Sequence, residues 1–227
     1  EIGVRLVGSE MCIRDRHFDY LLFDACFMSS IEALYDLRGC ADRIIASPCE
    51  VMAAGFNYTD ILPHLLADAG TSYDLPGVCS EYHDYYMNRA TTKSGCIALT
   101  VTGELEPLAA IVKEIETKYP GKTYDRASLQ TYEGLDEHVF YDLQGYIEAI
   151  CDEKDPLLDK FRAQMGKAFP TESRLHTPSF YSVYGLGDAP NGMHTIEDGK
   201  YSGVTTSAPC ERFAPEWAQT SWYRATH

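Results

Sequence analysis

The sequence predicts an α/β protein with a mostly parallel central sheet that is covered by helices. Short apolar runs, typical of strands buried on both faces, alternate along the chain with amphipathic segments of helical period. The chain has 227 residues, of which 45% are hydrophobic and 23% charged. This length and composition suit one globular domain with a sizeable core.

A buried strand followed closely by a helix opens the pattern. Residues 20–23 (YLLF) form the continuous apolar run of the strand. The helix is expected from Ser29, which has the spacing of a capping box with Glu32, to Gly39, where it stops. The strand and the helix are therefore joined by a tight connection.

The remaining elements follow from the same patterns. A loop over residues 48–57 is expected to turn at Gly55, and Pro63 is expected to bend its helix. The further predicted strands are residues 43–47, 95–102, 180–186, 193–196 and 201–207. The further predicted helices are residues 58–69, 75–90, 104–118, 140–151, 156–169 and 215–225.

Charge and cysteine spacing exclude several classes of function. Acidic residues exceed basic ones by 34 to 19, a net charge of −15, so the mean field repels nucleic acid. No run approaches the roughly 18 apolar residues that a membrane-spanning helix needs. The eight cysteines contain no CxxC pair, which argues against a zinc ribbon or a thioredoxin-like site. No metal ligands are predicted.

The first sixteen residues do not belong to the predicted domain. The stretch LVGSEMCIRDR, residues 6–16, resembles the read-through translation of a transposase-type sequencing adapter. A segment of this origin is not part of the folded domain. We therefore expect residues 1–16 to be an adapter-derived artefact, and residues 17–227 to be the carboxy-terminal portion of a single domain.

Cys26 is the candidate catalytic residue. It follows the strand over residues 20–23 and precedes the helix expected from Ser29. Sites in open α/β sheets form at the carboxyl ends of strands, and a helix amino terminus stabilises a nearby thiolate, the reactive form of cysteine. The position of Cys26 alone favours a buried core thiol, so its assignment as a catalytic residue depends on the surrounding sequence.

That surrounding sequence resembles a known family. Residues 24–32 (DACFMSSIE), preceded by YLLF, resemble the nucleophile segment of clostripain-type cysteine peptidases, relatives of caspases, legumain and gingipains. Residues 44–48 (IIASP) and 55–58 (GFNY) continue the resemblance, and Gly203-Val204 and Trp222-Tyr223 extend it more weakly. The resemblance implies a caspase-like three-layer fold that lacks its amino-terminal strands here.

The resemblance also implies a mechanism. Cys26 would attack the scissile carbonyl and form a thioester, while a histidine protonates the leaving amine. In the family this histidine lies in a His-Gly pair on an earlier strand, and no His-Gly pair occurs in this sequence. His17 lies nine residues before Cys26, roughly 30 Å away along an extended strand, and cannot serve. We therefore expect the chain to be inactive by itself.

Two residues are predicted to bind substrate. Asp24 matches an acidic position at the floor of the S1 pocket in relatives that cleave after arginine or lysine. An equal alternative is a strand-end carboxylate that caps backbone N–H groups. Ser47, in the matching IIASP stretch, is the second predicted substrate-binding residue. The other family acid falls on Ala54, a departure that weakens the case for a basic P1 residue.

The sequence thus predicts a cysteine endopeptidase acting on peptides or proteins. The resemblance implies a monomer and an extracytoplasmic location, and it leaves calcium as a cofactor with no residues assigned to it. The alternative is a non-catalytic caspase-like binding or surface module that kept the fold and lost the chemistry. An unrelated α/β-hydrolase is disfavoured because the sequence has no GxSxG elbow.

Overall fold

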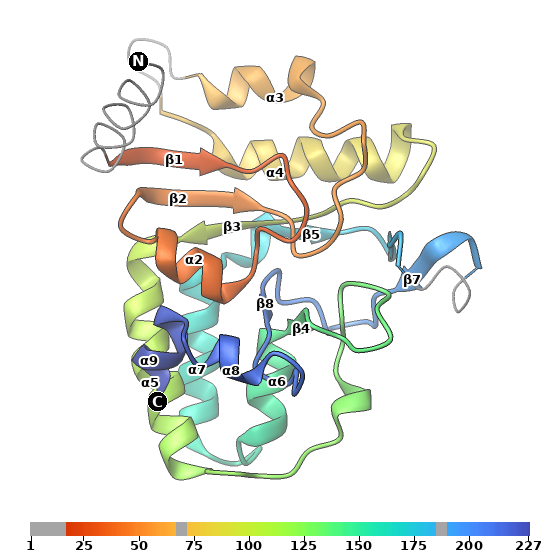
Figure 1. Cartoon of the computed structure of the whole chain (residues 1–227). Coiled ribbons are helices and arrows are strands. Elements are labelled where there is room, and N and C mark those ends of the chain that lie inside the picture. The colour runs from red at the N-terminus through yellow and green to blue at the C-terminus, as the bar shows by residue number, and fades with distance from the viewer. Residues whose placement is uncertain (1–16, 67–71, 185–189) are drawn as a thin grey trace, which may run out of the picture.

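A four-stranded sheet lies between two layers of helices in the computed structural model, which describes residues 17–66, 72–184 and 190–227 (Figure 1). The predicted adapter segment, residues 1–16, lies outside the described residues, as do the ends of the elements predicted over residues 58–69 and 180–186. The strand order is β1 (Phe18–Leu22), β2 (Ala41–Ala46), β3 (Cys96–Val101) and β5 (Arg174–His176).

Each face of the sheet has its own hydrophobic core. One face packs against α3 (Tyr58–Leu65) and α4 (Leu75–Asp84), which a π-helical turn, Tyr85–Arg89, extends. The helices on the opposite face are α2 (Ile31–Leu37), α5 (Leu105–Lys118), α6 (Leu143–Ile150), α7 (Pro156–Ala168) and α9 (Ser221–Thr226).

Strand β2 is apolar over residues 44–46, where both faces of the sheet are covered by helices. Ile44 and Ala46 belong to the core under α2 and α5, whereas Ile45 belongs to the core under α3 and α4. All three side chains are fully buried. Because successive side chains of a strand point to opposite faces, a strand covered on both sides needs apolar residues at every position.

The prediction of a mostly parallel sheet is wrong. β1 and β2 are parallel, but β2 pairs with β3 and β3 pairs with β5 in the antiparallel sense. The reason lies in the connection from β2 to β3, which contains the two helices α3 and α4 (Figure 1). A single crossover helix carries the chain to the opposite end of a sheet, whereas a pair of helices returns it to the end it left.

Several smaller elements differ from their predictions. β5 was not predicted, and the strand expected over residues 201–207 is reduced to β8 (Thr205–Thr206), which pairs with β4 (Tyr141–Asp142). The closing helix is two short ones, α8 (Ala214–Trp217) and α9. Of the strands expected over residues 180–186 and 193–196, the structure describes β6 (Ser179–Tyr181) and β7 (Met193–Thr195), which pair in the antiparallel sense.

Candidate active site

Cys26 is solvent-exposed on the turn that follows β1. The backbone N–H of Val51 donates to its Sγ at 3.3 Å, and the Sγ lies 3.8 Å from the carbonyl oxygen of Val51. The thiol therefore faces solvent while one polar donor of a neighbouring loop is directed at the sulfur. A buried core thiol, the common alternative for a cysteine at a strand end, is not what the structure places here.

The turn itself is held by the loop that follows β2. The N–H of Phe27 donates to the carbonyl of Cys49 at 3.1 Å, and that of Ser29 donates to the carbonyl of Ser47 at 3.0 Å. Phe27 has a positive φ of 59°, a conformation that a residue with a bulky side chain adopts only when its surroundings impose it. Its ring stacks on Phe140, with 4.6 Å between the ring centres.

The predicted capping box of α2 is wrong. The N-cap is Ser30, whose side chain accepts from the N–H of Ala33. Ser29 instead donates its hydroxyl hydrogen to the carbonyl of Gly203 at 2.7 Å. Ser29 is fully buried between the nucleophile turn and β8. Its side chain therefore makes a tertiary hydrogen bond and does not cap the helix.

Glu32, the other member of the predicted box, points into the protein interior. Its Oε1 accepts from the Thr206 hydroxyl at 2.9 Å, the Ser207 N–H at 2.9 Å and the Trp217 indole N–H at 3.0 Å. Burial raises the pKa of Glu32, and these hydrogen bonds offset only part of that rise. The first turn of α2 is thus tied to the carboxy-terminal part of the chain.

Asp24 is exposed and lies over Gly55. Its Oδ2 accepts from the Tyr58 hydroxyl at 3.0 Å and lies 3.5 Å from the N–H of Phe56. Burial and this hydrogen bond to Asp24 raise the pKa of Tyr58. The contacts are those of a carboxylate that caps nearby donors, and the exposed carboxylate also remains open to a ligand. Both readings of Asp24 therefore have structural support.

Ser47 is fully buried. Its hydroxyl donates to the carbonyl of Cys49 at 3.1 Å and accepts from the N–H of Cys49 at 3.2 Å. Ser47 also supplies the carbonyl that receives the N–H of Ser29. Its side chain therefore shapes the loop against which the Cys26 turn packs, and its hydroxyl does not face solvent.

No histidine hydrogen-bonds to Cys26 within the part of the chain that the structure describes. His17 lies at the start of β1, where it contacts Asp42 at 2.9 Å, at the opposite end of the strand from Cys26. The other polar contacts are His64 with Asp74, His83 with the carbonyl of His176, His138 with Glu133, His176 with the carbonyl of Thr177, and His227 with Thr226. His194 stacks on Phe180.

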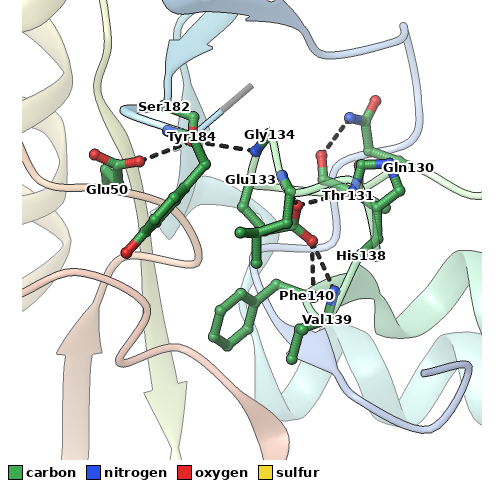
Figure 2. A network of polar contacts seen from close by, with 11 residues as sticks. Glu50, Gln130, Thr131, Glu133, Gly134, His138, Val139, Phe140, Ser182 and Tyr184 are labelled. Atoms are coloured by element: carbon green, nitrogen blue, oxygen red, sulfur yellow. Dashed lines mark hydrogen bonds and ion pairs between the residues drawn. The ribbon is translucent and has the colours of Figure 1, made fainter. Parts of the chain in front are cut away.

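Residues that the sequence did not single out connect the site to the rest of the fold. Glu50, next to Val51, accepts from the Ser182 hydroxyl at 2.8 Å, and Ser182 in turn accepts from the N–H of Gly134 at 3.1 Å (Figure 2). The partners of Glu50 lie more than 130 positions away, so no local pattern could have identified it.

Neither a metal site nor a membrane segment is found among the described residues. No group of three or more histidine, cysteine, aspartate or glutamate side chains there is arranged to hold a metal ion. Calcium, which the family resemblance implies, is assigned to no residues of this chain. No helix in these ranges is long and apolar enough to cross a membrane.

The fold and the exposed thiol define an α/β protein with a solvent-exposed cysteine at a strand-to-helix connection. The model of the Clostripain family, peptidase C11, matches residues 9–195. No curated protein matches the sequence. The chain belongs to the clostripain family of cysteine peptidases, which confirms the resemblance drawn from the residues around Cys26.

Solved structures of the family are similar along nearly the whole chain. A clostripain from Bacteroides thetaiotaomicron ATCC 29148, in complex with the peptide inhibitor BTN-VLTK-AOMK, is 32% identical with a TM-score of 0.82, covering 97% of this chain and 92% of that one. A secreted C11 cysteine protease from Bacteroides thetaiotaomicron, iotapain, is 34% identical with a TM-score of 0.81, covering 93% and 56%. An inactive zymogen C11 protease from Parabacteroides distasonis is 28% identical with a TM-score of 0.78, covering 95% and 60%.

Proposed function

We propose that this protein is a cysteine endopeptidase in which Cys26 is the nucleophile. The observation that carries the proposal is the exposed thiol at the end of β1, with the N–H of Val51 directed at its sulfur. A donor directed at the sulfur orients the group that would attack a carbonyl. Family membership supplies the reaction class, hydrolysis of a peptide bond through a thioester.

The backbone around Cys26 suits the developing oxyanion. The N–H groups of Phe27 and Ser29 are engaged by the loop after β2, whereas the N–H of Cys26 has no acceptor among the described residues. A free N–H at the nucleophile is the donor that acyl-transfer enzymes use to bind the tetrahedral oxygen. We assign that role to the Cys26 N–H.

We further propose that the proton-donating histidine is not one of the seven in this sequence. Those with hydrogen-bond partners are all engaged away from Cys26, and the sequence has no His-Gly pair. Without that histidine the leaving amine departs unassisted, so the chain alone is expected to be inactive. The gene upstream of the codon for His17 should encode a His-Gly pair within several dozen residues.

Asp24 is proposed to bind the P1 side chain of the substrate. It is exposed, it lies next to the nucleophile turn, and the peptide inhibitor of the similar clostripain, BTN-VLTK-AOMK, contains a lysine. Ser47, whose hydroxyl is buried, is proposed to act on substrate only through the loop that it shapes. By likeness to the secreted iotapain, an extracytoplasmic enzyme is expected. The monomeric state stays a prediction from the family resemblance.

The decisive experiment compares two cysteine variants of the full-length protein encoded by the gene. Cys26→Ala is expected to abolish cleavage of fluorogenic peptides and labelling by BTN-VLTK-AOMK. Cys40→Ala is the matched control, because Cys40 is a partly exposed free thiol at the start of β2, away from the turn. Cleavage that survives in Cys26→Ala would refute the assignment of the nucleophile.

The same experiment addresses a non-catalytic binding module, the second candidate. That candidate is favoured by the lack of a histidine contact to Cys26 among the described residues. A full-length protein that carries the upstream segment, folds normally, cleaves no peptide and is not labelled at Cys26 would support the binding module instead.

A further inference from the structure

One loop holds the residues on both sides of the Cys26 thiol. We define the Glu133 loop as residues 130–140. It contacts Phe27, which follows Cys26 in the chain, and it is linked by hydrogen bonds to Glu50, which precedes Val51, the donor to the sulfur. Neither of these two contacts includes a predicted substrate-binding residue, and neither belongs to the hydrogen bonds between the strands of the four-stranded sheet.

The first link is the aromatic stack of Phe27 on Phe140. The two rings are nearly parallel, 4° apart, with their centres separated by 4.6 Å. Phe27 holds a positive φ of 59°, so a chain released from this contact would relax toward a negative φ. That rotation would reorient the peptide that joins Cys26 to Phe27.

The buried carboxylate of Glu133 gives Phe140 its position. Its Oε1 accepts from the N–H groups of Val139 at 2.8 Å and Phe140 at 3.1 Å, and its Oε2 accepts from the Leu135 N–H at 2.9 Å and from His138 at 2.8 Å (Figure 2). Burial raises the pKa of Glu133, but the hydrogen bonds outweigh it and hold that pKa below its usual value. The loop is thus folded around an ionised carboxylate.

The second link runs through Ser182. Its hydroxyl accepts from the Gly134 N–H at 3.1 Å and donates to Glu50 Oε1 at 2.8 Å (Figure 2). The N–H of Val183 donates to the same oxygen at 2.7 Å. Ser182 is fully buried, so these bonds are shielded from competition with water. Glu50 is fixed in this way, and with it the N–H of Val51.

We propose that the Glu133 loop positions the nucleophile, with Phe140 and Ser182 as positioning residues that act on Cys26 through Phe27 and Val51. The inference rests on the proposed function of Cys26 for its catalytic meaning. The predicted geometry does not depend on that function: loss of either link should misplace the Cys26 sulfur relative to the Val51 N–H. A sulfur that loses this donor is no longer held in one orientation and reacts more slowly with an alkylating agent.

Iodoacetamide alkylation of Cys26, followed by peptide mass spectrometry on the folded chain, tests this directly. Phe140→Leu and Ser182→Ala are each expected to slow alkylation of Cys26 about tenfold at neutral pH, the equivalent of one lost hydrogen bond to a charged group. General loosening of the fold would expose thiols and speed their alkylation, so a slower rate is specific to the position of the sulfur. Phe140→Tyr should restore the wild-type rate.

The control is Tyr124→Leu, which removes another half-buried aromatic contact, that of Tyr124 with Tyr146 on α6. It should leave Cys26 alkylation unchanged. Unchanged alkylation rates in both Phe140→Leu and Ser182→Ala would overturn the positioning role, whatever the peptidase activity. Slowed alkylation in a full-length protein that cleaves no peptide would sustain the positioning role while refuting the proposed function. Thermal melts confirm that each variant is folded, and Ser182→Ala carries the test if Phe140→Leu is not.

Discussion

The indole N–H of Trp217 donates to Oε1 of the buried Glu32 at 3.0 Å, across 185 positions of sequence. Glu32 lies in the first turn of α2, the helix that follows the nucleophile turn, and Trp217 ends α8. The bond therefore fixes the carboxy-terminal part of the chain against the helix that carries the Cys26 segment. The contribution of this hydrogen bond to folding stability depends on the charge of the Glu32 carboxylate, which has little contact with water.

Glu32→Gln is expected to change the free energy of unfolding by less than about 1 kcal/mol at neutral pH, because a glutamine oxygen can accept all three hydrogen bonds of Oε1 while the cost of burying a charge disappears. Glu32→Ala leaves those donors unpaired and should cost about 3 kcal/mol. Urea unfolding at pH 7 measures both. A glutamine variant as unstable as the alanine variant would contradict this account.

The raised pKa of Glu32 also predicts how the stability of the fold changes with pH. Burial raises the pKa of Glu32 above its usual 4.5, so the folded state holds this proton more tightly than the unfolded state does. Stability from this group is therefore greatest below about pH 4.5 and declines as the pH rises from there through the raised pKa. Glu32→Gln should lack that decline when unfolding is followed from pH 5 to pH 8.

Gly55 is expected to tolerate no side chain. Its φ is 62°, and a Cβ there would lie 2.6 Å from Oδ2 of Asp24. Gly55→Ala should lower stability by about 1–3 kcal/mol and displace the Asp24 carboxylate. Gly121→Ala is the matched control, since Gly121 has a φ of 66° with no heavy atom within 4 Å of the added Cβ. Equal losses for the two variants in thermal melts would show that only backbone strain matters.

Asp24→Asn is expected to change substrate preference. Removing the carboxylate should reduce kcat/KM for peptides with lysine at P1 by roughly tenfold to a hundredfold relative to peptides with an uncharged P1 residue. Tyr58→Phe keeps the charge while removing the hydroxyl that donates to Asp24, so its preference should stay close to wild type. A lysine preference that survives in Asp24→Asn would assign the carboxylate to capping alone.

The His138–Glu133 pair predicts a second pH window. The hydrogen bond to Glu133 raises the pKa of His138 above its usual 6.5, so this stability is full below pH 6.5 and is lost as the pH rises through the raised value. The pKa of Glu133 is lowered from 4.5, so its share is present above pH 4.5 and is lost as the pH falls through the lowered value.

His138→Gln isolates that window. The difference in unfolding free energy between wild type and His138→Gln should be larger at pH 5.5 than at pH 8.5. The His138 side chain is 41% exposed, so screening by solvent limits the effect to about 0.5 kcal/mol. A difference that does not vary between these two pH values would remove the pair from the pH response of the protein.

The sequence by itself determined the fold class, the family and the place of Cys26. These depend on local patterns: apolar runs that alternate with amphipathic segments along the chain, and short matching stretches such as residues 24–32, 44–48 and 55–58. Apolar strands and amphipathic helices can be recognised in this way because burial imposes a periodicity on neighbouring residues.

Only the tertiary structure decided the direction of β3 and β5, the cap of α2 and the contacts that fix the Cys26 turn. The direction of β3 follows from the two helices that pack in the connection before it, and the hydroxyl of Ser29, which was predicted to cap α2, donates instead to the distant carbonyl of Gly203. Glu50 and Glu133 look like ordinary surface acids in the sequence. They become structural because folding brings donors more than 130 positions away to Glu50 and encloses Glu133 within its own loop, and neither event leaves a periodic signal in the chain.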